Sequence, residues 1–277
     1  MIREVAYYPG CALEGSAREY DVSARLVFKA LGVELREVPD WICCGASSTH
    51  GLSQEAALAL PAHTLRAASQ MGLPLMAPCA MCYSRFKLAY LDLVSADILA
   101  RTEAALGEKI GSLPPVVHPL QVLEDIAPQA KTPLDIKVAC YYGCLLVRPP
   151  AAGFDDQENP TIMDSIALAW GAQPVPWAFK TECCGAGMAV ARSDMVARLS
   201  RRVLDQARQA GAEAVIVACP MCQANLDLYT GEKEIPVIYI TQLIGLALGL
   251  SSRELMLDRH IISPLPLLRA KGVVAHG

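Results

Sequence analysis

The sequence has few charged residues and lacks the segments that mark export or membrane insertion. Charged residues make up 19% of the 277 positions, and the formal net charge is −4. Such a chain has no electrostatic reason to bind nucleic acid or an anionic membrane. No basic segment with an apolar run opens the chain, and its longest apolar stretch, Ile238 to Leu250, is interrupted by Thr241 and Gln242. We therefore expect a cytoplasmic protein with no nucleic-acid partner and no direct membrane insertion.

Nucleotide-binding loops are also missing. The chain contains no Gly-x-Gly-x-x-Gly and no Walker loop, so a bound nucleotide is not expected. It also has no cubane-type ferredoxin motif and no flavin fingerprint. The chain is therefore not expected to work alone.

Cysteine is abundant and regularly placed. Ten of the eleven cysteines form two arrays, each with one cysteine, then an adjacent Cys-Cys-Gly, then a Cys-x-x-Cys pair. The first array has the spacing Cys-x31-Cys-Cys-x34-Cys-x2-Cys and the second Cys-x38-Cys-Cys-x34-Cys-x2-Cys. The first contains Cys11, Cys43, Cys44, Cys79 and Cys82; the second contains Cys144, Cys183, Cys184, Cys219 and Cys222. The duplication indicates two equivalent metal-binding halves.

Five thiols per array favour iron–sulfur clusters over a single ion. Structural zinc takes four ligands, and adjacent cysteines on an extended backbone point to opposite sides. Five thiolates would repel one another unless several cations lay among them. Gly45 and Gly185, without a Cβ, would let the backbone approach inorganic sulfide. Zinc in both arrays, or zinc in one and a cluster in the other, stays an alternative; disulfides would need an oxidising compartment that nothing in the sequence indicates.

Apolar runs alternate with helical patterns through both halves. Short strands are predicted at Val5 to Tyr8 and Lys137 to Tyr141, each followed by glycine and cysteine. Long amphipathic helices are predicted after each Cys-Cys-Gly, near Gln54 to Met71 and Asp194 to Ala210. This alternation predicts an α/β fold of two pseudo-symmetric, Rossmann-like halves with mostly parallel sheets, residues 1–134 and 135–277. Ligands of such sheets gather at the carboxyl ends of the strands, where the cysteines would converge.

The arrays resemble those in the B subunit of heterodisulfide reductases, a Cys-Cys-Gly domain iron–sulfur family. The resemblance covers essentially the whole chain and includes Lys180 to Met188, Ala218 to Asn225 and Leu257 to His260. It implies that each array binds a noncubane [4Fe–4S] unit through its five cysteines. It also implies that a small disulfide is cleaved, or formed, between the two clusters. Electrons would arrive from a ferredoxin-like C subunit, itself supplied by a flavin-bearing A subunit.

Another interpretation assigns the chain a different class of function. It could be an electron-transfer or scaffold subunit of a sulfur-oxidising complex that handles thiols or persulfides, with zinc in place of one cluster. A third class is a zinc-stabilised interaction protein. The complete five-cysteine arrays favour catalysis, because a plain electron relay needs only four-cysteine cubanes.

Several residues near the arrays are candidates for supporting roles. His50, close to Cys44, could donate a proton to a leaving thiolate or cap the next helix. Lys180, close to Cys183, could offset cluster charge or steer an anionic substrate, or could simply be solvated. Cys140 is interpreted as a buried, inert thiol. The second long helix carries basic residues that could dock an electron-donor subunit or form a solvated face: Arg192, Arg198, Arg201, Arg202 and Arg208.

Overall fold

We analysed a computed structural model of the chain. It describes residues 2–46, 49–51, 53–128, 130–131, 134–229 and 235–275. The side chain of His50 lies outside this description, as do residues 129, 132 and 133 of the segment that links the two halves.

The first half is built on a four-stranded parallel sheet. Its strand order is β2-β1-β3-β4. The strands are β1 (Glu4–Tyr7), β2 (Glu34–Glu37), β3 (Leu75–Met76) and β4 (Val116–Val117). The inner strands β1 and β3 are almost wholly buried and apolar, as parallel strands covered on both faces must be.

The second half repeats this sheet in the same order, β6-β5-β7-β8, again with every pair parallel. The strands are β5 (Lys137–Tyr141), β6 (Gln173–Pro174), β7 (Ala214–Val217) and β8 (Val237–Tyr239). Pro174 lies in an edge strand, where the missing N–H removes no ladder bond. The predicted α/β fold with two similar halves is confirmed. The sequence pattern also predicts a strand over Gln173 to Trp177, but β6 covers only Gln173 and Pro174.

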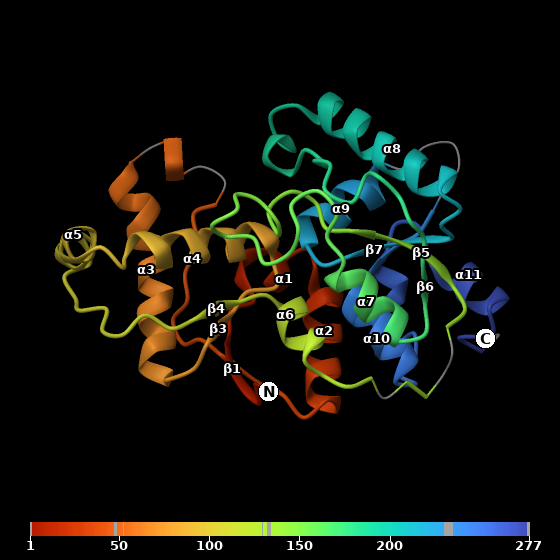
Figure 1. Cartoon of the computed structure of the whole chain (residues 1–277), viewed down its shortest axis with the longest axis horizontal. Coiled ribbons are helices and arrows are strands. Elements are labelled where there is room, and N and C mark those ends of the chain that lie inside the picture. The colour runs from red at the N-terminus through yellow and green to blue at the C-terminus, as the bar shows by residue number, and fades with distance from the viewer. Residues whose placement is uncertain are drawn as a thin grey trace.

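Helices cover the sheets and connect the parallel strands (Figure 1). The first half has α1 (Gly10–Glu14), α2 (Arg18–Ala30), α3 (Gln54–Met71), α4 (Ala80–Asp92), α5 (Ala96–Leu106) and α6 (Pro119–Glu124). The second has α7 (Ile162–Ala169), α8 (Ser193–Gln209), α9 (Pro220–Leu228), α10 (Ile240–Ala247) and α11 (Leu265–Ala270). Within the described residues, none of these helices combines the length and apolar character that crossing a bilayer requires.

One predicted helix is divided in two. The sequence pattern predicts a helical segment from Tyr90 to Leu106, but α4 ends at Asp92 and α5 begins at Ala96. Ser95 interrupts the run in an extended conformation as the N-cap residue of α5. Periodicity alone did not reveal this interruption, because apolar residues continue across it.

The two halves contact each other through pseudo-equivalent helices. The helix that follows the first cysteine segment of each half packs on the helix that follows the last strand of the other half, so α2 contacts α10 and α7 contacts α6. Between α2 and α10 the Ser23 and Thr241 hydroxyls lie 2.7 Å apart, and the rings of Tyr20 and Tyr239 stack with centroids 4.2 Å apart. In Figure 1 the two sheets lie side by side with these helices between them. The central contact is therefore buried and specific.

Candidate metal centre

The first array assembles at the carboxyl ends of its strands, as predicted. Cys11 follows β1, the Cys43-Cys44 pair follows β2, and Cys79 is the N-cap residue of α4, whose first turn contains Cys82. The sulfur atoms of Cys44 and Cys82 lie 3.1 Å apart, and the hydrogen bond with Cys82 lowers the pKa of Cys44 to about 7. Burial and the neighbouring Cys43 thiol raise the pKa of Cys11. Segments far apart in sequence thus bring their thiols together.

The second array repeats the arrangement and surrounds a cavity. The sulfur atoms of Cys184 and Cys222 lie 3.7 Å apart, and this hydrogen bond lowers the pKa of Cys184. A hydrogen bond from Cys144 lowers the pKa of Cys183 to about 6. All five cysteines of the array line one cavity of about 130 Å³. This is several times the space that one ordered water requires, so a polyatomic group fits among the thiols.

The cavity also has a wall from the other half. Ala80 and Met81, which separate Cys79 from Cys82 in the first array, line it together with Met221 and Tyr141 of the second half. A hydrogen bond between Cys79 and Cys219 joins the two arrays and raises the pKa of Cys79. The two predicted centres therefore face a shared region, as expected for pseudo-symmetric halves.

Equivalent tyrosines hold both Cys-Cys loops. Tyr8, three residues before Cys11, donates a hydrogen bond to the carbonyl of Ile42 at 2.9 Å. Tyr141, three residues before Cys144, donates to the carbonyl of Glu182 at 2.6 Å. Each acceptor directly precedes its Cys-Cys pair, so the same bond fixes the backbone of both ligand loops. Both hydroxyls therefore bind the backbone that carries the candidate ligands. Groups in this position typically orient metal ligands.

Glycine is required after each Cys-Cys pair. Gly45 and Gly185 have φ angles of +73° and +83°, in the left-handed region that glycine favours. A Cβ on Gly45 would lie 2.6 Å from Thr49 Oγ1. The backbone N–H of each glycine points back to the first thiol of its pair, with Gly45 N 3.5 Å from Cys43 Sγ and Gly185 N 3.3 Å from Cys183 Sγ. The geometry shows why glycine is needed here, and the predicted approach of the backbone to inorganic sulfide stays a prediction.

His118 connects the two Cys-x-x-Cys loops at the centre of the molecule. Its Nε2–H faces the carbonyls of Pro78 at 3.0 Å and Ala218 at 3.1 Å, the residues just before Cys79 and Cys219. Its Nδ1 accepts a hydrogen bond from Leu120 N–H, so the ring is the neutral Nε2–H tautomer. Burial lowers the pKa of His118 to about 4. A neutral histidine therefore sets the spacing between the two arrays.

Lys180 is buried in an ion pair. Its Nζ lies 3.0 Å from Asp164 Oδ1 and donates to the carbonyl of Pro160 at 2.9 Å, while Tyr142 donates to the other carboxylate oxygen at 2.7 Å. Only 6% of the residue is exposed, so the alternative of a solvated lysine is wrong. Lys180 is not among the described residues that line the cavity. Its predicted action on cluster charge or substrate stays a prediction, and its contacts make it a positioning residue of the Cys183 loop.

The two other candidate residues are Cys140 and His50, and the structure describes the side chain of Cys140 only. Cys140 lies in β5, fully buried, and burial raises the pKa of its thiol. This agrees with an inert thiol. The backbone of His50 forms part of the short 3-10 helix Thr49–Gly51, but its side chain lies outside the description, so its predicted role remains a prediction.

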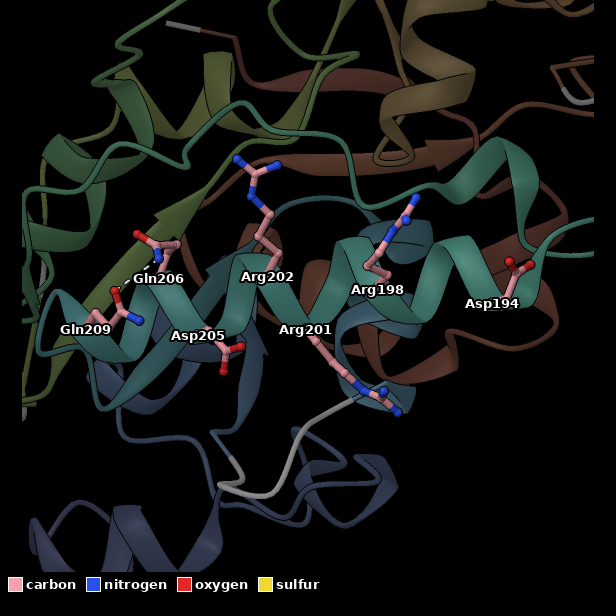
Figure 2. Close-up of a pocket in the computed structure, with 7 residues that line it drawn as sticks. All are labelled: Asp194, Arg198, Arg201, Arg202, Asp205, Gln206 and Gln209. Atoms are coloured by element: carbon pink, nitrogen blue, oxygen red, sulfur yellow. Dashed lines mark hydrogen bonds between the residues drawn. The ribbon is translucent and has the colours of Figure 1, made fainter.

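The basic helix predicted in the second half is α8, which packs against α9, the helix that begins after Cys219 (Figure 1). A Cβ on Gly185 would lie 3.2 Å from Val196 and 3.3 Å from Leu199, which shows how closely α8 covers the Cys-Cys-Gly loop. Arg192 pairs with Asp194, and Arg208 pairs with Asp205. The exposed side chains of Arg198, Arg201 and Arg202, hereafter the basic face, extend from the helix around a surface hollow (Figure 2). Arg202 also lies over the ring of Phe179 at 5.1 Å.

The donor set suits a multi-iron cluster. All eleven cysteines are free thiols, so none of them is used in a disulfide. Within the described part of the chain, no three or more Cys, His, Asp or Glu side chains are grouped like the ligands of one metal ion. Five soft sulfur donors placed around a common cavity instead match a group with several iron atoms.

Five residues near the arrays were not identified from the sequence as site residues: Tyr8, Arg85, His118, Tyr141 and Asn225. Asn225 donates to the carbonyl of Cys184 at 3.3 Å and approaches its sulfur at 3.7 Å. Arg85 occupies the same place after the first Cys-x-x-Cys pair. Aligning the two halves residue by residue, rather than only their cysteines, would have exposed these positions.

Comparison with known proteins agrees with this arrangement. The model of the cysteine-rich CCG domain family matches residues 5–87 and 138–227, which together contain all ten array cysteines. Over 96% of the chain, it is 33% identical to the 8-methylmenaquinol:fumarate reductase membrane anchor subunit of Wolinella succinogenes, whose whole length is covered. It is 29% identical to the B subunit of the ferredoxin/F420H2-dependent CoB-CoM heterodisulfide reductase of Methanosarcina acetivorans, over 96% of both chains.

A solved structure supports the fold alone. A hypothetical protein from Helicobacter pylori superposes with a TM-score of 0.76 at 13% identity. The match covers 94% of this chain but 52% of that one, so the chain spans about half the length of that protein.

Proposed function

The chain belongs to the cysteine-rich CCG domain family, and on that premise we propose that it is the catalytic iron–sulfur subunit of a heterodisulfide reductase-like complex. Its reaction would be the reductive cleavage, or the formation, of a small-molecule disulfide. Heterodisulfide reductase B subunits among its relatives match it over nearly their entire length, which supports an oxidoreductase subunit of this type.

Each array would hold one noncubane [4Fe–4S] cluster. Cys11, Cys43, Cys44, Cys79 and Cys82 would bind the first, and Cys144, Cys183, Cys184, Cys219 and Cys222 the second. Such a pair of clusters supplies electrons singly on the two sides of a two-electron bond. Tyr8 and Tyr141 would hold the ligand loops, and His118 would fix the separation of the two Cys-x-x-Cys segments.

The observation that carries this proposal is the cavity lined by all five thiols of the second array and by residues of the first. Met81, Met221 and Tyr141 give it an apolar and polarisable wall that suits organic sulfur compounds and limits access of water. The cluster would fill the cysteine-lined side of this cavity, and a bound disulfide or thiol would lie against Met81 and Met221, between the two arrays. We propose His50 as the proton donor to the departing thiolate, a role that exchange for glutamine would test through the pH dependence of turnover.

The electron donors would be a ferredoxin-like C subunit and, behind it, a flavin-bearing A subunit. Helix α8 carries four arginines against two aspartates, in a chain whose net charge is −4. The basic face therefore complements an acidic redox protein, and it lies on the helix that covers the second Cys-Cys-Gly loop. The unpaired thiols support action in a reducing compartment such as the cytoplasm.

A second candidate function is electron transfer without disulfide chemistry. It is favoured by the 33% identity to the fumarate reductase membrane anchor subunit, which is matched over its entire length. In this role the chain would pass electrons between partner subunits and would not bind a small thiol. Zinc in place of one cluster fits this alternative.

The deciding experiment measures metal content and ligand binding on the same anaerobically purified protein. Iron, acid-labile sulfide and zinc are determined, and EPR spectra are recorded with and without the CoM–CoB heterodisulfide and with 2-hydroxyethyl disulfide. About eight irons and negligible zinc, with a spectrum changed by a disulfide, support the catalytic proposal. Two clusters with no spectral response to either disulfide support electron transfer. About four irons and one zinc overturn the two-cluster proposal.

A further inference from the structure

Arg85 and Asn225 occupy equivalent positions that differ in charge. Each lies three residues after the last cysteine of its Cys-x-x-Cys pair, one turn along the helix that this pair begins. Asn225 is buried and directs its amide to Cys184, as its 3.3 Å bond to the carbonyl and 3.7 Å contact with the sulfur show. Arg85 thus places a cation where the second half has a neutral amide.

Arg85 is held close to the first array. Its Nη2 donates to the carbonyl of Ala57 in α3 at 3.2 Å. Its Nε is buried and has no hydrogen-bond partner among the described residues. Arg85 lies three residues after Cys82 in α4, so the helix places its positive charge on the same face as this ligand of the first array. Since a guanidinium does not lose its proton in proteins, this charge is permanent.

A second pair of equivalent positions also differs in charge, and again the second half is the more negative. Ile42 and Glu182 each precede a Cys-Cys pair, and their carbonyls accept the equivalent bonds from Tyr8 and Tyr141. The backbones therefore correspond, but the side chain is neutral in the first half and acidic in the second. Glu182 directly precedes Cys183, so its carboxylate adds negative charge next to a ligand of the second array. Because Glu182 is exposed, solvent screens its effect, which must be smaller than that of Arg85.

We infer that the first cluster is the more readily reduced of the two, because Arg85 stabilises the added electron while Glu182 opposes an added electron at the second cluster. Net charge and hydrogen bonds around the sulfurs are the main protein determinants of cluster potential. Asn225 offsets part of the difference with a hydrogen bond to Cys184, but at 3.7 Å this bond is long. This inference rests on the proposed function, which supplies the two clusters.

The asymmetry assigns each half a different task. A cluster held by the first array, with Arg85 beside it, would accept the first of two electrons delivered singly. The cavity lies at the second array, where the neighbouring Glu182 would make a bound cluster the stronger electron donor. A two-electron reaction could thus begin only after each cluster has received one electron.

The test is a redox titration of each cluster alone. Anaerobic Cys184→Ala and Cys44→Ala chains retain only the first or only the second cluster, and EPR follows reduction against potential. The first cluster is expected to be reduced at the higher potential, by at least a tenfold ratio of equilibrium constants, about 59 mV for one electron. Arg85→Asn should lower the midpoint of the first cluster, whereas Arg85→Lys should preserve it.

Variants of the second cluster provide the reciprocal measurement. Asn225→Arg should raise its midpoint, and Glu182→Gln should raise it by less; the surface position of Glu182 keeps that variant informative if the buried Asn225→Arg does not fold. Equal midpoints in the two single-cluster chains, or no shift with Arg85→Asn, would overturn this inference while the iron content still supports the proposed function. A chain that binds no iron at all overturns both.

Discussion

The two halves share a backbone plan but differ in the charges that surround it. Strand order, the tyrosine-to-carbonyl bond before each Cys-Cys pair and the left-handed glycine after it are the same in both halves. Arg85 corresponds to Asn225, and the four arginines of α8 correspond to a single arginine, Arg66, in α3. Duplication thus preserved the geometry that binds metal, whereas the charges diverged. Similar ligand sets can therefore have different redox and docking properties.

Each half also contains a tyrosine–aspartate–cation group, built from tyrosines at positions that are not equivalent. In the first half Tyr7 donates to Asp21, whose partner Arg25 comes from the same helix and has a side chain 36% exposed. In the second half Tyr142 donates to Asp164, whose partner Lys180 comes from the loop before the Cys-Cys pair and has a side chain 8% exposed. Only the second group ties a ligand loop to a helix.

Removing one cysteine ligand from one array should produce the largest difference between the two halves. Cys184→Ala should abolish disulfide reduction and lower iron from about eight to about four per chain, leaving the spectrum of the first cluster. Cys44→Ala should leave the other cluster. Cys140→Ala, also a buried thiol, should retain both clusters and activity. Metal analysis, EPR and turnover check this; full activity in Cys184→Ala would contradict the two-cluster mechanism.

Removing the cation from each tyrosine–aspartate group should affect the second half far more. Lys180→Met leaves the partly buried Asp164 carboxylate without a counter-charge and should cost about 4 kcal/mol of unfolding free energy. Arg25→Met removes an exposed partner and should cost about 1 kcal/mol or less. Urea unfolding of anaerobic protein measures both. Similar costs for the two variants would mean that burial does not distinguish the groups.

His118 and its counterpart Tyr239 are both N-cap residues after the last strand, and only the first can gain a proton. The pKa of His118 is about 4 in the folded chain, below its ordinary value near 6.5. Between these values the unfolded chain binds more protons, so stability is lost as pH falls through this range, by about 3 kcal/mol in full. His118→Gln should remove this dependence.

The measurement for His118 is the difference in unfolding free energy between parent and variant from pH 7.5 to 4.5. Taking the difference cancels acid effects that both proteins share. If the difference in unfolding free energy between parent and variant does not change with pH, protonation of His118 does not destabilise the contact between the two Cys-x-x-Cys loops.

Reversing the basic face tests whether the docking surface belongs to one half only. Arg198→Glu, Arg201→Glu and Arg202→Glu together should weaken association with the C subunit at least tenfold, because attraction to an acidic surface becomes repulsion. The matched control is Arg36→Glu, Arg101→Glu and Lys109→Glu, the same charge change on exposed positions of the first half. Pull-down and binding titration measure the association of both triple variants with the C subunit. An equal loss of affinity in both would indicate a general charge effect.

The smallest expected effect comes from changing the two tyrosines that bind the Cys-Cys loops, and it tests whether the two halves are equivalent there. Tyr8→Phe and Tyr141→Phe each remove one hydrogen bond to a carbonyl before a Cys-Cys pair, at a cost of about 1 kcal/mol. The two costs should agree, because the bonds are equivalent. Denaturant unfolding checks this, and a clear difference between the variants would show that one loop depends on the bond more than the other.

The cysteine spacing and the alternation of strands and helices predicted most of the fold. A duplicated spacing can be recognised without coordinates, and apolar strands between amphipathic helices have distinct periods, so the parallel sheets followed from local pattern. The divided helix at Ser95 did not, because the apolar pattern continues across the break. Lys180 was close enough in sequence to Cys183 to be noticed, but its partner Asp164 could not be inferred.

The sequence by itself determined that ten thiols belong to two equivalent arrays and that each array needs glycine after its Cys-Cys pair. Only the tertiary structure decided that His118 joins the two Cys-x-x-Cys loops, that Met81 of one half lines the cavity of the other, and that Lys180 is buried. The physical reason is the range of the interactions. Ligand spacing and backbone preference are local, whereas burial and charge depend on residues that meet only when the two halves pack together.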